Sequence, residues 1–201
     1  MKRLFAILSA FTICTAYAEA GNGKRDDDLP FRYEFRLGWS GYPTNDDMQF
    51  SDYEDHYWGD TSISDIFSSY DGPTYMTGNI MAEVDLHFRK WFTLSVGVAA
   101  NGIWKDVYDA QTEKLTGRES GITMTLIPQA RFTWARKGMM SFYSSVGVGL
   151  KGGRFDGYSD LYLAAQCSPF GFTIGKKLFG FAEVGFGSIY TGGMIGIGYR
   201  F

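Results

Sequence analysis

The sequence predicts an all-β fold, an eight-stranded antiparallel up-and-down β-barrel that crosses a membrane with its strands. Two features of the composition favour many short strands and turns: 26 of the 201 residues are Gly, and 17% are aromatic. The third observation is a period of two in hydrophobicity, in which apolar residues alternate with polar or small ones over eight separate runs. The formal net charge of −3 is mildly acidic, so no nucleic-acid partner is expected.

The first 18 residues have the pattern of an export signal. Lys2 and Arg3 precede an apolar stretch over 4–15, and Ala16-Tyr17-Ala18 forms a small-x-small cleavage site. The stretch is shorter than the roughly 20 apolar residues of a spanning helix. We therefore expect a signal peptide over 1–18, a disordered leader over 19–29 and a barrel domain over 30–201.

The run 31–40 shows the alternation most clearly. One face carries Phe31, Tyr33, Phe35, Leu37 and Trp39, and the other carries Arg32, Glu34, Arg36, Gly38 and Ser40. The same pattern predicts seven further strands, at 79–88, 92–101, 122–134, 141–150, 158–170, 182–187 and 195–201. Pro169 marks either the end of the sixth strand or a bulge in it.

The connections between these runs alternate in length. Short turns are expected at 89–90, 135–138 and 175–177, and long loops at 43–75, 105–120, 151–157 and 188–193. An even number of strands, with short turns at one end and long loops at the other, is typical of outer-membrane barrels. In that arrangement both termini lie on the periplasmic side and the long loops are extracellular.

Two kinds of barrel fit this alternation. A soluble barrel places its apolar face inward around a ligand, whereas a membrane barrel places that face outward on lipid. Girdles of aromatic residues near the strand ends favour lipid outside. The residues of these girdles are Phe31, Phe88, Trp91, Phe92, Trp134 and Phe201 at the turn side, and Trp39, Tyr42 and Trp104 at the loop side.

The last strand contains Gly196, Tyr199 and Phe201 in a pattern that resembles the C-terminal insertion signal of outer-membrane barrels. The region 19–201 resembles the small OmpA- and OmpX-like barrels, and 168–201 resembles uncharacterised barrels of the Bacteroidetes type. The resemblance implies a monomer in the outer membrane of a Gram-negative cell envelope. Its partners would be lipid and lipopolysaccharide, and the barrel-assembly machinery during insertion. It carries no catalytic residues and no cofactor.

The polar faces of the strands predict a network of charges inside the barrel. Its residues are Arg32, Glu34, Arg36, Glu83, Asp85, His87, Arg131, Glu183 and Arg200. Eight strands enclose a space that side chains fill, and buried charges must be paired. We therefore expect a polar plug; a gated narrow pore, in which an Arg–carboxylate pair switches partners, is the alternative.

An enzyme that modifies lipid A is a less favoured alternative. A hydrolytic triad needs a Ser and a His placed together. His56 has no matching Ser motif around it, and His87 is expected near the periplasmic end, whereas an enzyme acting on lipid A needs its groups near the outer leaflet. No catalytic, cofactor-binding or metal-binding residue is expected, because no metal-ligand spacing occurs.

The first long loop is the most distinctive segment. It holds eight Asp or Glu residues and no Lys or Arg between Pro43 and Tyr75. Its central part is Asp52, Tyr53, Glu54, Asp55, His56, Tyr57 and Trp58. This loop is either kept soluble by its charge or is a surface for an unidentified extracellular ligand. The expected function is a non-enzymatic barrel that presents this loop for envelope stability or for adhesion and binding.

Overall fold

A computed structural model describes residues 31–41, 43, 46, 69–155 and 158–201 of the chain. The chain divides into two units, Met1–Pro30 and Phe31–Phe201, and all described residues belong to the second. The signal peptide and leader predicted over 1–18 and 19–29 lie outside the described residues.

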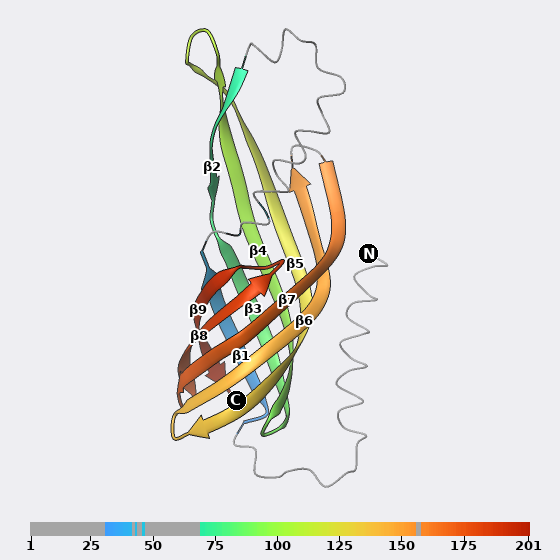
Figure 1. Cartoon of the computed structure of the whole chain (residues 1–201), viewed down its shortest axis with the longest axis vertical. Coiled ribbons are helices and arrows are strands. Elements are labelled where there is room, and N and C mark those ends of the chain that lie inside the picture. The colour runs from blue at the N-terminus through green and yellow to red at the C-terminus, as the bar shows by residue number, and fades with distance from the viewer. Residues whose placement is uncertain (1–30, 42, 44–45, 47–68, 156–157) are drawn as a thin grey trace. The chain divides into compact units, whose positions relative to one another are not determined.

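The described residues form nine β-strands, which confirms the predicted all-β class (Figure 1). The strands are β1 (Tyr33–Ser40), β2 (Ser69–Met76), β3 (Asn79–Arg89), β4 (Phe92–Asp109), β5 (Leu115–Lys137), β6 (Met140–Phe155), β7 (Tyr158–Gly175), β8 (Leu178–Gly187) and β9 (Gly192–Arg200). Among these residues, no helix has the length and apolar character needed to cross a membrane.

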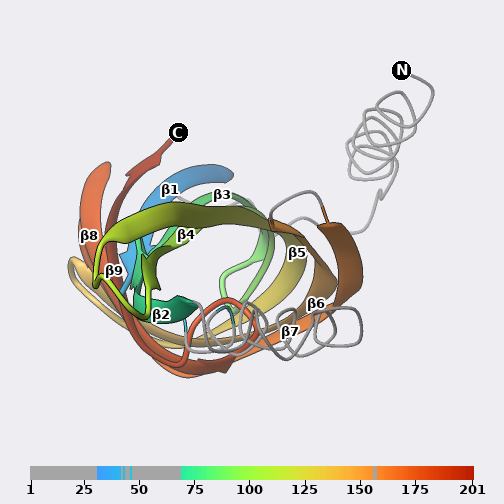
Figure 2. The same cartoon turned by 90° about the horizontal axis from the view of Figure 1, so that it is seen from above.

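All the strand pairings are antiparallel, and they close into a ring (Figure 2). The order is β4-β3-β1-β9-β8-β7-β6-β5, and β5 pairs again with β4. β2 and β3 share one position, because β2 pairs with the far part of β4 and β3 with the near part. The ring therefore has eight positions for its nine strands.

The two faces of the ring have opposite polarity. In β1 every second residue is buried, including Glu34 and Arg36, while Phe35 and Leu37 are 43% and 45% exposed. We call the outward apolar side chains of the ring the apolar belt. It includes Phe35, Leu37, Trp39, Ile80, Val84, Val98, Ile122, Met124, Leu126, Val146, Val148, Leu150, Leu161, Leu163, Val184, Phe186, Ile195 and Ile197. Proteins in water rarely expose a contiguous apolar surface of this kind.

Aromatic side chains stack at the end of the ring that holds the tight turns, which we call the turn end. Trp91 lies 6.2 Å from Phe132, and Trp134 lies 5.6 Å from Phe142, measured between ring centroids. At the opposite end, the loop end, Tyr75 stacks on Trp104 at 6.2 Å. Aromatic residues therefore flank the apolar belt at both ends.

The structure corrects several predicted boundaries. Residues 69–76, expected in the first long loop, form β2. The expected loop over 105–120 is a tight turn over 110–114, because β4 and β5 run to Asp109 and from Leu115. Here Lys105 and Asp106 place charge on both faces of β4, so the alternation that marks the rest of the strand is lost. Of the two alternatives predicted for Pro169, the bulge is confirmed: β7 continues to Gly175, and its register shifts near Pro169 against both β6 and β8.

Candidate functional site

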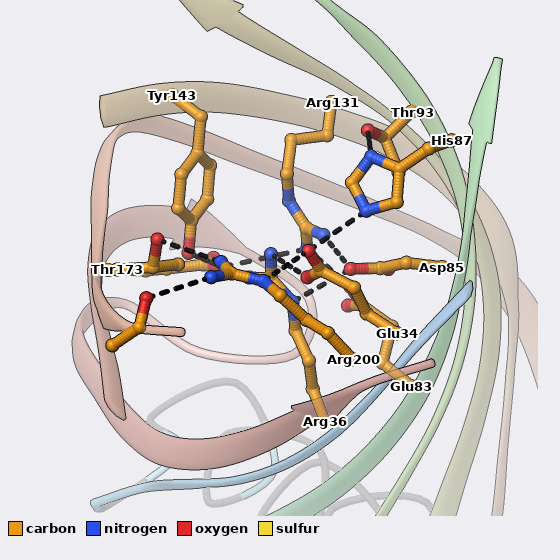
Figure 3. Close-up of polar contacts among 12 residues, drawn as sticks. Glu34, Arg36, Glu83, Asp85, His87, Thr93, Arg131, Tyr143, Thr173 and Arg200 are labelled. Carbon is orange, nitrogen blue, oxygen red and sulfur yellow. Dashed lines mark hydrogen bonds and ion pairs between the residues drawn. The ribbon is translucent and has the colours of Figure 1, made fainter. Parts of the chain in front are cut away.

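The interior of the ring holds a cluster of buried charges near the turn end, which we call the charge cluster (Figure 3). Its members are Glu34, Arg36, Glu83, Asp85, Arg131, Glu183 and Arg200, and each is at most 9% exposed. The strand registers bring them together, because β1 pairs Glu34 with Asp85 and Arg36 with Glu83. Four carboxylates thus lie among three guanidinium groups.

Arg131 on β5 binds two carboxylates of β3. Its Nη1 donates to Asp85 and its Nη2 donates to Glu83. The guanidinium also lies over the ring of Tyr143, 4.9 Å from its centroid. A planar guanidinium with several donors suits two carboxylates at once, so Arg131 holds β5 to β3 across the interior.

Arg36 lies at the centre of the charge cluster. Its Nη2 donates to Glu34 at 3.0 Å, and its Nε lies 2.7 Å from Oδ2 of Asp85. Its Nη1 donates to the hydroxyl of Tyr143 at 3.0 Å, and that hydroxyl donates to Glu183 at 2.7 Å. Arg36 therefore connects β1 to β3, β6 and β8.

Arg200 on β9 closes the cluster at the turn end. Its Nε donates to Glu34 at 2.8 Å, and its Nη2 donates to Thr173 at 3.2 Å. Its Nη1 donates to the carbonyl oxygens of Gly175 and Lys176, at 3.1 and 3.0 Å. Arg200 thus binds four acceptors, which come from β1, from β7 and from the turn that follows β7.

His87 lies at the edge of the charge cluster. Its Nε2 is 2.9 Å from Oε1 of Glu34, and its Nδ1 is 2.8 Å from the hydroxyl of Thr93. The carboxylate and the Thr hydroxyl hold the imidazole on both sides, and all three groups are buried.

A second polar group, which the alternation of the sequence does not predict, lies nearer the loop end. Asp46 is fully buried and accepts from Lys151, from Asn101 at 2.7 Å and from Thr123 at 2.8 Å. Asp46 was expected in a solvated loop, and Lys151 in the loop over 151–157. Asp46 and Lys151 are charged, as surface residues usually are, and only the three-dimensional structure shows that they meet inside the ring.

The remaining predicted residues do not join the charge cluster. Arg32 is a correction: it precedes β1 and its side chain is exposed. Its backbone N–H donates to the carbonyl of Phe201 at 3.4 Å, and its carbonyl accepts from the N–H of His87 at 3.0 Å. Tyr199 and Phe201 point outward and contact each other edge to face at 5.1 Å. The loop-surface residues Asp52, Tyr53, Glu54, Asp55, His56, Tyr57 and Trp58 lie outside the described residues.

No group of three or more His, Cys, Asp or Glu residues suited to a metal ion occurs in the part of the chain that the structure describes.

The chain matches no protein-family model, no curated protein and no solved structure. The roles of these residues therefore rest on their geometry alone. That geometry is a dense set of ion pairs joining β1, β3, β5, β8 and β9.

Proposed function

We propose that the chain is an integral outer-membrane β-barrel without enzymatic activity, closed by an internal polar plug, that presents its loop end at the cell surface. The observation that carries the proposal is the reversed polarity of the ring. Its interior buries the seven charged side chains of the charge cluster together with Asp46 and Lys151, while its outer surface exposes the apolar belt. Lipid favours apolar side chains on the outside of the ring. Closure of the ring also leaves no unpaired strand edge inside the bilayer.

Strand lengths support the same proposal. β1, β8 and β9 have 8, 10 and 9 residues, close to the roughly 9–11 residues with which a tilted strand spans a bilayer. β4 and β5 have 18 and 23 residues. Their additional length lies at the loop end, so they extend beyond the apolar belt (Figure 1).

The extension beyond the belt is a three-stranded sheet made of β2 and the far ends of β4 and β5, which we call the tip. Its outward face carries a stacked pair, Tyr70 and Tyr108 at 5.5 Å, and an ion pair from Arg118 Nε to Asp106 at 2.7 Å. Exposed aromatics with polar groups and paired charges suit a surface that contacts other molecules. Envelope stability, or adhesion and binding through the loop end, is the function that we propose for it.

Labelling of intact cells tests which end is outside. Thr112→Cys lies in the turn of the tip, and Met139→Cys lies in an exposed turn at the opposite end. In a Cys167→Ser background, a membrane-impermeant maleimide should label the first variant on intact cells and the second only after lysis. Labelling of Met139→Cys alone on intact cells would contradict the proposed orientation, and labelling of neither would contradict surface exposure.

A further inference from the structure

The connection between β8 and β9 folds into the ring. Ile189 and Tyr190 are only 1% and 3% exposed. A turn between two strands ordinarily points its side chains to the surface. We call residues Ser188–Tyr190 the inner turn.

Side chains of three other strands bind the backbone of the inner turn. Oε1 of Gln166 accepts from the N–H groups of Ile189 and Tyr190 at 3.1 and 3.3 Å, and its Nε2 donates to the carbonyl of Tyr190 at 3.1 Å. Asn79 donates to the carbonyl of Ile189, and Lys151 donates to that of Ser188 at 2.8 Å. A single amide side chain thus contacts the peptide as a donor and as an acceptor, as a neighbouring strand would.

The side chains of the inner turn pack into a buried apolar cluster, and we call the space that they fill there the chamber. The buried cluster around them contains Met81, Ala99, Ile127, Phe179, Phe181 and Met194. The hydroxyl of Tyr190 donates to Glu183 at 3.0 Å and lies 2.7 Å from that of Ser168. Apolar walls with a few convergent polar groups are the usual composition of a ligand site.

Glycines at both ends attach the inner turn to its strands. Gly187 and Gly192 have φ angles of 151° and 113°, which residues with a side chain rarely adopt. A Cβ on Gly187 would lie 2.3 Å from the carbonyl oxygen of Ala165, whereas one on Gly192 would meet nothing within 4 Å. The inner turn is therefore flanked by two positions whose backbone conformation favours glycine.

We propose that this chamber is a binding site for a short peptide-like ligand carrying a branched aliphatic and a phenol side chain, and that the inner turn occupies it in this structure. Gln166, Asn79 and Lys151 recognise the peptide backbone. The apolar cluster receives the aliphatic group, and Glu183 with Ser168 receives the phenol. This proposal depends only on the interior of the ring, so it is independent of the proposal that the protein lies in the outer membrane.

The site is tested by removing the two side chains that fill the chamber and adding a peptide that carries them. The full-length variant with Ile189→Gly and Tyr190→Gly is titrated with N-acetyl-Ile-Tyr-amide by calorimetry in detergent micelles. We expect saturable binding to this variant and binding at least about tenfold weaker to the wild-type protein, whose site is occupied. A folded variant that does not bind the peptide would overturn the proposal, and so would one that cannot fold, because the inner turn would then be a fixed part of the core.

Two interior glutamines provide a matched comparison. Gln166→Leu, added to the emptied variant, should weaken binding about tenfold or more, because three hydrogen bonds are lost. Gln129→Leu should leave binding unchanged, since Gln129 is also buried but takes no part in the hydrogen bonds to the inner turn described above.

The two glutamine substitutions can also be compared in the chain that keeps its inner turn. There, the rate of maleimide labelling of Ile189→Cys is measured in a Cys167→Ser background. Gln166→Leu should accelerate maleimide labelling, and Gln129→Leu should not. Equal effects of the two substitutions in either experiment would overturn the assignment of Gln166.

Discussion

Glu34 on the first strand of the ring and Arg200 on the last are joined by an ion pair, with Nε of Arg200 donating to Oε1 of Glu34 at 2.8 Å. The two residues are also direct partners in the pairing of β1 with β9. The same carboxylate binds Arg36 and contacts His87. The seam that closes the ring is thus held by side chains as well as by the backbone.

Arg131 should be the most costly charge to remove. Arg131→Met leaves Glu83 and Asp85 buried without their main partner, which typically costs about 3–5 kcal/mol. Urea unfolding in lipid vesicles measures the change in the free energy of unfolding. Arg118→Met is the control, because the exposed Arg118–Asp106 pair is worth about 0–1 kcal/mol. Equal losses for the two variants would show that the charge cluster is not a stabilising network.

A cation placed in the apolar belt should impair membrane insertion. Leu126 and Leu115 are exposed residues of the same strand, one within the belt and one in the tip. Leu126→Arg should destabilise the inserted protein by about 2–4 kcal/mol, the usual cost near the bilayer midplane, and Leu115→Arg should be tolerated. The yield of folded protein after refolding into vesicles separates the two. Similar yields would argue that β5 does not cross the bilayer.

The wild-type protein should form no stable open pore in a planar bilayer. Glu183→Ala removes the acceptor of Tyr143 and Tyr190 and a carboxylate within 4 Å of Arg36 and Arg131. We expect it to raise the frequency of brief openings, whereas Glu119→Ala at the tip should have no such effect. A large, stable wild-type conductance would instead favour the gated pore.

The turn of the tip should loosen in acid. Three hydrogen bonds hold one oxygen of Asp109: the N–H and hydroxyl of Thr112, at 2.7 and 2.8 Å, and the N–H of Gln111, at 3.0 Å. These hydrogen bonds lower the pKa of Asp109 below its usual value. The stabilisation is therefore complete above the usual range of Asp and is lost as the pH falls through the lowered pKa.

Trypsin cleavage after Lys114 at neutral pH measures how far the hydrogen bonds of Asp109 order the turn. Asp109→Ala should accelerate cleavage at neutral pH, and Asp109→Asn, which keeps one acceptor oxygen, should do so less. Unchanged cleavage in both variants would show that Asp109 does not order the turn.

The sequence predicts those strands whose two faces meet different surroundings. In 31–40 and 141–150 one face is apolar and the other polar or small, and β1 and β6 follow that alternation. Where both faces of a strand have polar residues, the alternation is lost and the sequence predicts a loop instead. This is the case for β2 and for the far ends of β4 and β5.

Interior contacts were harder to predict than strands. Glu83, Asp85 and Arg131 could be placed inside because they stand at inward positions of clear strands. Asp46 and the inner turn could not, because a connection has no periodicity from which to infer that it folds inward. Their burial depends on partners far along the chain, such as Lys151 and Gln166.

The central claim is that the apolar belt faces lipid. Its most direct test is fractionation of Gram-negative cells that express the full chain, with membranes washed in sodium carbonate and separated on a sucrose gradient. The account predicts recovery in the outer-membrane band, with release only by detergent. Recovery as a soluble periplasmic protein without detergent would contradict it.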